Sequence, residues 1–348
     1  MFKRLVLSLI VIGGLIGAAG FYFYKDQLGK PIGKDISFVV KKGQTFHSVL
    51  NFLQTKLNTP ASIGKLYLKV KGQESALKPG EYVLSKDLTF EKAIVLLSKG
   101  QIIEHRVTIP EGYNVFEIAK LLEKKEIIQD KKDFLELALN RCDDFLVKED
   151  CVTDSLEGFL FPETYQFQKK TEPAIVLKTM AEHHLDQKKI LMSKYELPST
   201  LESWSELVTL ASVIEKETGA SWERPLISSV FHNRLSMGMR LQSDPTTIYG
   251  RWVKDKKRLF NIKKKHLLEK TPFNTYTVAR LPVGPIANPG KLALEAALNP
   301  KTSRYLYFVS KNDGTHKFSK NYKEHQKAVR DFQLSRRARK GKSWRDLK

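Results

Sequence analysis

The sequence predicts an α+β protein whose soluble part is attached to a membrane by one N-terminal helix. An uncharged apolar run occupies residues 5–24, and a pattern of strand, glycine turn and helix occurs twice between residues 38 and 124. A largely helical region at 173–237 is followed by loops and a short strand. The chain has 348 residues, of which 41% are apolar, so it can bury a core in more than one domain.

The apolar run, LVLSLIVIGGLIGAAGFYFY, is expected to be a transmembrane helix over residues 5–24. About 20 helical residues cross the ~30 Å hydrocarbon layer of a membrane. Lys3 and Arg4 precede the run, and the positive-inside rule then keeps a stub of residues 1–4 in the cytoplasm. Residues 25–35 are expected to form a linker on the other side of the membrane.

Two interpretations of this N-terminal segment remain open. The sequence has no second apolar run of that length, which predicts a single-pass protein of the cytoplasmic (inner) membrane whose larger part is periplasmic or extracytoplasmic. Gly17, Ala18 and Ala19 also imitate the small-residue cleavage site of a signal peptide, and cleavage there would release the soluble part.

The two cysteines are candidates for a disulfide bond. Cys142 and Cys151 bracket the short polar segment RCDDFLVKEDC, and a close pair in an oxidising compartment favours a local bridge. No basic or histidine-rich neighbour in the sequence would activate either thiol as a nucleophile. Two unpaired thiols are the alternative.

The net charge of +21 raises the question of a polyanionic partner. The excess lies partly in KKKH at 263–266 and in a basic C-terminal tail at 335–348, and neither run is interleaved with the aromatic residues that single-stranded nucleic acid requires. We therefore expect no nucleic acid as a partner. Outside the membrane, lipid head groups and cell-wall polymers are the available polyanions, and a merely solvated basic face is the alternative.

Residues 36–125 are expected to form an α+β region built from two related units. FVVKKGQTFHSVLNFLQ at 38–54 and RVTIPEGYNVFEIAKLLEK at 106–124 align on Gly43 and Gly112. Alternating apolar residues precede each glycine, and apolar residues at helical spacing follow it. Such units resemble LysM modules, which bind the N-acetylated sugars of peptidoglycan. Two spacer modules packed against each other are the alternative.

Two glutamates, Glu215 and Glu217, stand at the end of a predicted helix, where the macrodipole makes each carboxylate unfavourable by roughly 0.3 to 1 kcal/mol. The two point to nearly opposite sides, and Glu217 shares its face with Leu210, Val213 and Ile214. Apolar surroundings and the helix dipole both raise the pKa of a carboxyl, which suits a general acid. An ion pair with Lys216 or Arg224 is the alternative use of such a glutamate.

The segment LASVIEKETGASWERPLISSVFHNRLSMGMRLQSDPTTIYG resembles the central motif of the endolytic murein transglycosylases, the YceG-like family. EGFLFPETY at 157–165, NTYTVARLPVGPIANPG at 274–290 and YLYFV at 305–309 are similar to other signatures of that family. The resemblance covers roughly residues 1–330, and it implies that residues 126–334 form a transglycosylase catalytic domain.

The resemblance implies that Glu217, the second glutamate of EKET, is the catalytic residue. It further implies cleavage of nascent glycan strands between N-acetylmuramic acid and N-acetylglucosamine, with formation of 1,6-anhydro ends, which would limit strand elongation during cell-wall assembly. The sugar's own C6 hydroxyl is the nucleophile, so one glutamate acts first as acid and then as base. Peptidoglycan strands are the implied partner, and membrane-bound glycan synthases are a further candidate.

Motif positions also suggest substrate contacts around that glutamate, because an oxocarbenium-like transition state needs orientation and charge stabilisation. Two of these residues, Tyr165 and Tyr249, could pack their rings on pyranose faces. For Asp244, a turn or helix cap is the alternative role. The full set of candidate contacts is Asn233, Gln242, Ser243, Asp244, Thr246, Tyr249, Asn274, Tyr276 and Tyr165.

One loop departs from the family pattern NTYxxxGLPPGPI. Arg280 replaces the glycine and Val283 replaces the second proline, so the local turn and the charge of a nearby subsite are expected to differ.

Two rival functions follow from the same residues. A muramidase-type hydrolase would use Asp244 as a second carboxylate that serves water, and a non-catalytic peptidoglycan-binding scaffold would need neither carboxylate. The sequence has no GxSxG, HExxH or Walker-type glycine loop, and we expect neither a metal nor a cofactor.

Overall fold

The computed structural model describes most of the chain, and it divides the protein into two compact units. Unit 1 comprises residues 1–105 and 166–169, and unit 2 comprises residues 106–165 and 170–348. The basic tail expected at 335–348 lies, apart from Ser335, outside the described residues. The structure describes residues 2–41, 43–57, 59–72, 77–151, 153–259 and 261–335.

Unit 1 is a small α+β unit that follows a long N-terminal helix. Strands β1 and β2 pair antiparallel, from Ile36 opposite Leu84 to Val40 opposite Gly80. Its elements are α1 (Phe2–Gly29), β1 (Ile36–Val40), α2 (Phe46–Leu57), α3 (Ala61–Lys71), β2 (Gly80–Leu84) and α4 (Phe90–Ser98).

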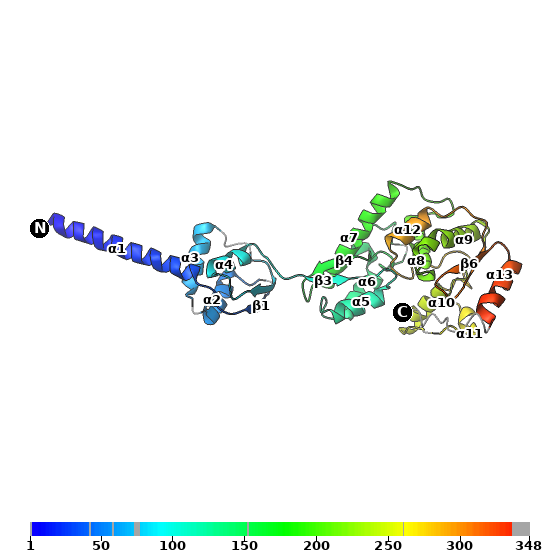
Figure 1. Ribbon diagram of the computed structural model, residues 1–348, viewed down its shortest axis with the longest axis horizontal. Coiled ribbons are helices and arrows are strands. Elements are labelled where there is room, and N and C mark those ends of the chain that lie inside the picture. Colours follow the sequence, from blue (N-terminus) through cyan, green and yellow to red (C-terminus); the bar gives the residue numbers. More distant parts are fainter. Residues whose placement is uncertain are drawn as a thin grey trace. The chain divides into compact units, whose positions relative to one another are not determined.

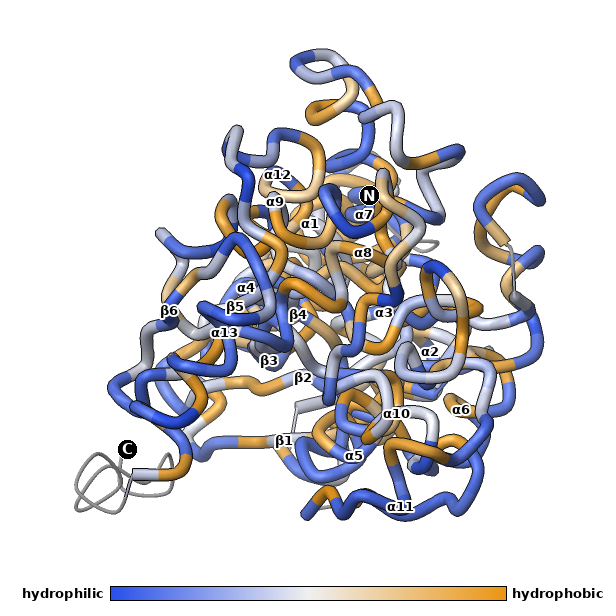
Figure 2. The backbone as a smooth tube through the Cα atoms, turned by 90° about the vertical axis from the view of Figure 1, so that its right-hand side faces the viewer, coloured by the Kyte–Doolittle hydropathy of each residue, from blue (hydrophilic) through white to orange (hydrophobic). Residues whose placement is uncertain are grey.

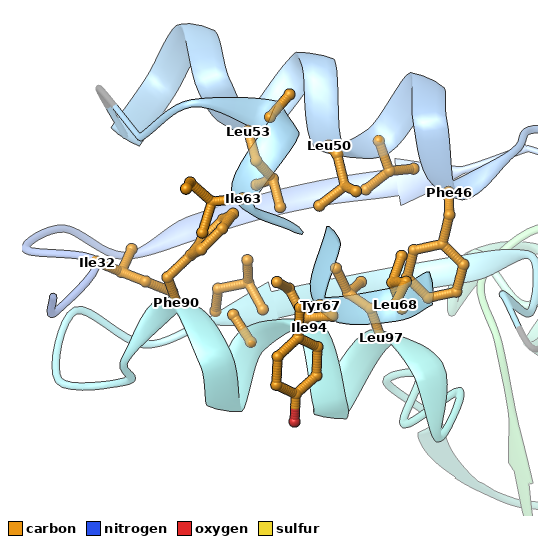
Figure 3. Packing of buried hydrophobic residues seen from close by; sticks show 14 of the residues in the cluster. Ile32, Phe46, Leu50, Leu53, Ile63, Tyr67, Leu68, Phe90, Ile94 and Leu97 are labelled. Carbon is orange, nitrogen blue, oxygen red and sulfur yellow. The ribbon is translucent and has the colours of Figure 1, made fainter. Parts of the chain in front are cut away.

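The core of unit 1 forms where amphipathic helices meet. Leu50 and Leu53 of α2 approach Ile94 and Leu97 of α4, and all four side chains are fully buried (Figure 3). Thr89 caps the start of α4 by accepting a hydrogen bond from the Lys92 backbone amide. Burial of these apolar side chains is the main force that holds so small a unit together.

Helix α1 is continuous from Phe2 to Gly29 (Figure 1). Among the described residues, one helix, Arg4–Gly29, is long and apolar enough to cross a membrane, a test that a signal sequence also passes. The linker expected at 25–35 therefore begins with helical residues. Leu28 is buried in the unit 1 core, and this burial gives the last turn of α1 a reason to stay helical.

Both predicted repeat units contain a strand, a left-handed glycine and a helix, but they belong to different units. Gly43 and Gly112 have φ angles of 85° and 74°, a region in which glycine avoids the steric cost of a Cβ. Strand β3 (His105–Thr108) pairs with β4 (Thr164–Phe167) rather than with β1. The division between the units falls at 105/106, within the region 36–125 that the sequence predicts as one, so the two repeats lie in different units.

Unit 2 is mainly helical, and α8 packs against α9, α10 and α12. The basic run at 263–266 belongs to a hydrophilic stretch of the chain (Figure 2), where three lysines are exposed and His266 is buried. The remaining elements are α5 (Val115–Lys124), α6 (Lys131–Asn140), α7 (Pro173–Met192), α8 (Trp204–Glu217), α9 (Arg224–Ser236), α10 (Asp244–Asp255), α11 (Lys264–Leu267), α12 (Lys291–Leu298), β5 (Tyr307–Ser310), β6 (His316–Ser319) and α13 (Tyr322–Val329), with short turns η1 (Cys142–Asp144), η2 (Ser221–Glu223) and η3 (Arg330–Leu334).

Cys142 and Cys151 are joined by a disulfide in the structure, with Cα atoms 5.8 Å apart. We expect the double variant Cys142→Ser/Cys151→Ser to lose roughly 2–3 kcal/mol of unfolding free energy, because the bridge closes a short loop in the unfolded chain. Denaturant unfolding under oxidising conditions measures the loss. A double variant as stable as the oxidised wild type would show that the bridge contributes nothing.

Candidate active site

Helix α8 carries Glu215 and Glu217 in its last turn, and its two ends are set by local sequence. Ser203 begins the helix by accepting a hydrogen bond from the Glu206 amide at 3.2 Å, and the helix ends at Glu217, after which Thr218 is extended. Leu210, Val213 and Ile214 are fully buried. Val208 and Ala211, on the Glu215 side of the helix, are also fully buried, so α8 is buried on all sides rather than along one apolar stripe. The two carboxyl groups point to different sides of the helix because successive residues are about 100° apart.

Glu215 is occupied by a buried ion pair. Its Oε1 accepts a hydrogen bond from Arg224 Nη2 at 2.7 Å, and its Oε2 accepts one from the Gly290 amide at 3.1 Å. The side chains of Glu215 and Arg224 are only 5% and 7% exposed. A second carboxylate, Glu111, lies 3.5 Å from the same guanidinium. The ion pair with Arg224 that was the alternative role of Glu217 is formed by Glu215 instead.

Glu217 has a different environment, in which one hydroxyl holds a half-buried carboxyl group. Ser243 Oγ donates a hydrogen bond to Glu217 Oε1 at 2.5 Å. Burial and, less strongly, the Asp244 charge raise the pKa of Glu217, and the Ser243 hydrogen bond and the Arg234 charge lower it, so that the pKa is about 7. At neutral pH this carboxyl is divided between its protonated and ionised forms, as a group that both gives and takes a proton must be.

Ser243 is held in place by the turn before α10 and by the segment 274–276. Its backbone amide donates to Thr275 Oγ1 at 2.9 Å, and its carbonyl accepts from Thr246 Oγ1 at 2.6 Å. Gln242 adopts a φ of 53°, in the left-handed region that non-glycine residues rarely occupy. Its amide donates to the Thr275 carbonyl at 3.2 Å, which secures this turn and aims Ser243 at the carboxyl.

Arg234, which sequence reasoning missed, supplies a fixed positive charge near Glu217. The side chain is 7% exposed, and its guanidinium donates to the carbonyls of Leu306 and Leu241, each at 2.7 Å. Its charge acts on Glu217 and on Tyr276. Arg234 follows the candidate Asn233 in the FHNRL motif, and its place in that motif is the sequence signal that points to it.

Asp244 and Tyr276 form a second polar pair beside the carboxyl. Tyr276 donates its hydroxyl to Asp244 Oδ1 at 2.7 Å. Burial and the Asp244 charge raise the pKa of Tyr276, so its hydroxyl keeps its proton. Of the candidate contacts, the structure therefore brings Ser243, Asp244 and Tyr276 into the surroundings of Glu217, with Thr246 and the exposed Gln242 supporting the turn.

The two candidate asparagines are engaged by backbone groups of the fold. Asn233 Nδ2 donates to the carbonyls of Ser303 and Tyr305 at 3.1 and 2.9 Å. Asn274 is 1% exposed, its Nδ2 donates to the Glu269 carbonyl at 2.6 Å, and its Oδ1 accepts from Thr247 Oγ1. Both side chains thus tie loops to helices in this structure.

The two tyrosines proposed for ring stacking are buried. Tyr165 is 4% exposed, and its hydroxyl donates to the Phe161 carbonyl at 2.6 Å. Tyr249 is 5% exposed, and its hydroxyl donates to Glu157 Oε2 at 2.8 Å. Neither ring presents a face of useful size at the surface of the protein.

Glu157 is a buried carboxyl away from these groups. It accepts hydrogen bonds from the Val115 amide at 3.1 Å, from Tyr249 and from Asn288 Nδ2 at 2.9 Å. Burial raises its pKa to about 8. Glu157 thus links α5, α10 and the loop that contains Asn288, because its hydrogen-bond partners Val115, Tyr249 and Asn288 belong to these three segments.

Arg280, the departure from the family pattern, does not add an unpaired cation. Its Nη1 lies 3.0 Å from Glu202 Oε1, and its Nη2 lies 3.5 Å from Glu206 Oε2. Arg280 is not among the residues of positive φ. The arginine therefore fits its turn, and its charge is balanced by two carboxylates.

The carboxyl of Glu217 thus has a raised pKa and lies near a hydroxyl, an arginine and an acid–tyrosine pair, and titratable groups perturbed in this way are enriched at functional sites. The chain belongs to the YceG-like family, whose model matches residues 38–331. The assignment agrees with the resemblance found in the sequence.

Known proteins of the same kind are similar over nearly the whole chain. The endolytic murein transglycosylase of Bacillus subtilis is 32% identical over 90% of this chain and 90% of its own length. The enzyme of the same name from Streptococcus pneumoniae (strain D39) is 29% identical over 94% of this chain, which spans 65% of that longer protein. The crystal structure of a YceG-like protein from Listeria monocytogenes is 29% identical, covers 85% of this chain and 99% of that one, and has a TM-score of 0.56.

Proposed function

We propose that this protein is an endolytic lytic transglycosylase that cleaves nascent peptidoglycan strands between N-acetylmuramic acid and N-acetylglucosamine. The observation that carries the proposal is the carboxyl of Glu217, whose pKa is raised to about 7 while its neighbour Glu215 is held in an ion pair. One such group is sufficient for a reaction whose nucleophile is part of the substrate.

The reaction proceeds in two proton transfers through the same carboxyl. Ser243 occupies Oε1, so Oε2 carries the proton that passes to the glycosidic oxygen as the bond from that oxygen to C1 breaks. The C6 hydroxyl of the same muramyl sugar then attacks C1, and its proton passes to Glu217. The products are a 1,6-anhydro end and a free 4-hydroxyl, and water is not consumed.

Surrounding groups stabilise the charges that develop. The Asp244–Tyr276 pair supplies negative charge and a hydroxyl for the oxocarbenium-like centre, and Arg234 stabilises the carboxylate that Glu217 becomes. Preorganised groups of this kind act without reorganisation at the moment of reaction. Glycosidases that use water generally need two carboxyl groups in acid and base or nucleophile roles.

Digestion of uncrosslinked glycan in ¹⁸O-labelled water tests the proposed reaction. The enzyme used is the full-length protein, kept soluble in detergent. Mass spectrometry is expected to find anhydro ends and no incorporated ¹⁸O. Reducing ends labelled with ¹⁸O would instead show a muramidase-type hydrolase with Asp244 serving water. Intact glycan with retained binding would point to a non-catalytic scaffold.

The pH at which cleavage activity falls should depend on the negative charge of Asp244, which lies near Glu217. Because the acid must be protonated, kcat/KM is expected to fall as pH rises through about 7. The Asp244 charge raises the pKa of Glu217, so Asp244→Asn should move this fall to lower pH. Asp255→Asn, at the other end of α10, is the matched control and should leave the midpoint in place. An unmoved or raised midpoint in Asp244→Asn would contradict the assignment.

The N-terminal parts are proposed to bring this chemistry to the membrane surface. Helix α1 would be a single-pass anchor in the cytoplasmic membrane with the N-terminus inside, and unit 1 would be a LysM-like module that binds glycan. Supporting observations are the length and apolar composition of α1 and the small α+β arrangement of unit 1. Such placement suits release of strands near membrane-bound glycan synthases, and the enzyme would thereby limit strand elongation.

A further inference from the structure

A group of three rings lies on β5 and α13 beside Arg234. The Tyr307 ring packs against the Arg234 guanidinium, with 5.0 Å between the ring centroid and Cζ. His325 stacks on Tyr307, with centroids 5.0 Å apart and planes 22° apart. Tyr322 lies 6.0 Å from Tyr307 and 6.4 Å from His325, centroid to centroid. We call Tyr307, Tyr322 and His325 the aromatic shelf.

The aromatic shelf leads from the neighbourhood of the acid to solvent. Arg234 is buried, and its charge acts on both Glu217 and Tyr307. Tyr307 and His325 are half-buried, and Tyr322, the first residue of α13, is 59% exposed. Of the three rings, Tyr322 therefore leaves the most ring surface open to solvent.

The chemistry of the shelf suits a neutral ligand that has one apolar face and a polar edge. Burial and the Arg234 charge lower the pKa of His325, so its imidazole is uncharged at neutral pH. Tyrosine rings combine an apolar face with a hydroxyl at the rim, a combination favoured where one side of a ligand is dry and the other is wet. A pyranose ring has this same division between its C–H face and its hydroxyl edge.

We propose that the aromatic shelf is a glycan subsite, at which the exposed ring of Tyr322 packs against a pyranose ring that flanks the bond cleaved at Glu217, while Tyr307, covered by Arg234 and His325, supports the shelf from within. The inference rests on the proposed function, because an enzyme that cuts within a strand must hold sugars beyond the reacting pair. The shelf takes the stacking role that the sequence assigned to Tyr165 and Tyr249, whose rings are buried.

Binding measured without cleavage tests the shelf. In full-length protein in detergent that carries Glu217→Gln, titration calorimetry with uncrosslinked glycan oligosaccharides should show that Tyr322→Ala weakens affinity roughly threefold to tenfold. Tyr322→Phe keeps the ring face and should retain the affinity. Tyr195→Ala, which removes a half-buried ring on the loop after α7, is the matched control and should also retain it.

A second pair of measurements separates this inference from the function itself. Tyr322→Gln, which keeps a helix-forming side chain without a ring, should weaken binding as Tyr322→Ala does, and with Glu217 intact both should raise KM more than they lower kcat. Unchanged affinity in both variants, at unchanged thermal stability, overturns the shelf and leaves the transglycosylase intact. If the wild type forms no anhydro ends, the proposed transglycosylase activity is wrong. Even then, a loss of glycan affinity in Tyr322→Ala would support a glycan-binding subsite at the shelf.

Discussion

Glu217→Gln is expected to lower kcat for glycan cleavage by about 10²–10⁴-fold while leaving glycan affinity nearly unchanged. The amide can still accept the Ser243 hydrogen bond through its oxygen, so the geometry is preserved. It cannot give a proton to the glycosidic oxygen or take one from the C6 hydroxyl. Single-turnover kinetics on uncrosslinked glycan, together with a separate affinity measurement, resolves the two effects.

The matched control for this variant is Glu182→Gln. Glu182 lies on α7, its side chain is 59% exposed, and its nearest cation, on Lys178, is 3.9 Å away. Its replacement should leave both kcat and affinity at wild-type values. A Glu217→Gln variant that retained more than about a tenth of wild-type turnover would contradict the role of general acid and base, since that role carries at least a hundredfold effect.

Glu215→Ala is expected to have the second largest effect, a loss of about 3–5 kcal/mol of unfolding free energy in unit 2. The substitution leaves the Arg224 guanidinium buried, and among the described residues the half-exposed Glu111 at 3.5 Å is the acidic partner that remains. It also removes the acceptor of the Gly290 amide. Denaturant unfolding followed by tryptophan fluorescence measures the loss, because every tryptophan of the chain lies after residue 203.

Two comparisons make this stability prediction specific. Glu182→Ala breaks only a surface pair and should cost at most about 1 kcal/mol. The double variant Glu215→Leu/Arg224→Met removes both buried charges and should recover most of the loss. A cost below about 1 kcal/mol for Glu215→Ala would mean that the ion pair does not stabilise the end of α8.

Local sequence places the two glutamates on different sides of α8, although the structure buries Val208 and Ala211 on the Glu215 side as fully as the residues on the Glu217 side. The helical period places Leu210, Val213 and Ile214 on the side of Glu217, and the structure buries all three. The glycine turns at Gly43 and Gly112, both left-handed in the structure, could also be predicted from local sequence, because a turn between a strand and a helix depends on neighbours a few residues away. These features need no knowledge of the rest of the fold.

Features that depend on distant segments were not accessible in the same way. The local patterns of the two repeats are alike, but β3 pairs with β4, which follows it by more than fifty residues, so the second repeat belongs to unit 2. The role of Arg234 depends on carbonyls of Leu241 and Leu306 that only the folded chain brings together. Motif position alone likewise did not reveal that the ring of Tyr249 is buried on Glu157.

The most direct test of the account is the titration of the Glu217 carboxyl itself. In protein labelled with ¹³C at the glutamate carboxyl groups, the signal absent from the Glu217→Gln spectrum identifies this residue, and its chemical shift can be followed with pH. We expect a midpoint near 7, because burial raises the pKa of Glu217 to about that value despite the opposing Ser243 hydrogen bond and Arg234 charge. A midpoint near 4.5, the ordinary value for a glutamate, would mean that the carboxyl is ionised at neutral pH and cannot begin the reaction as an acid.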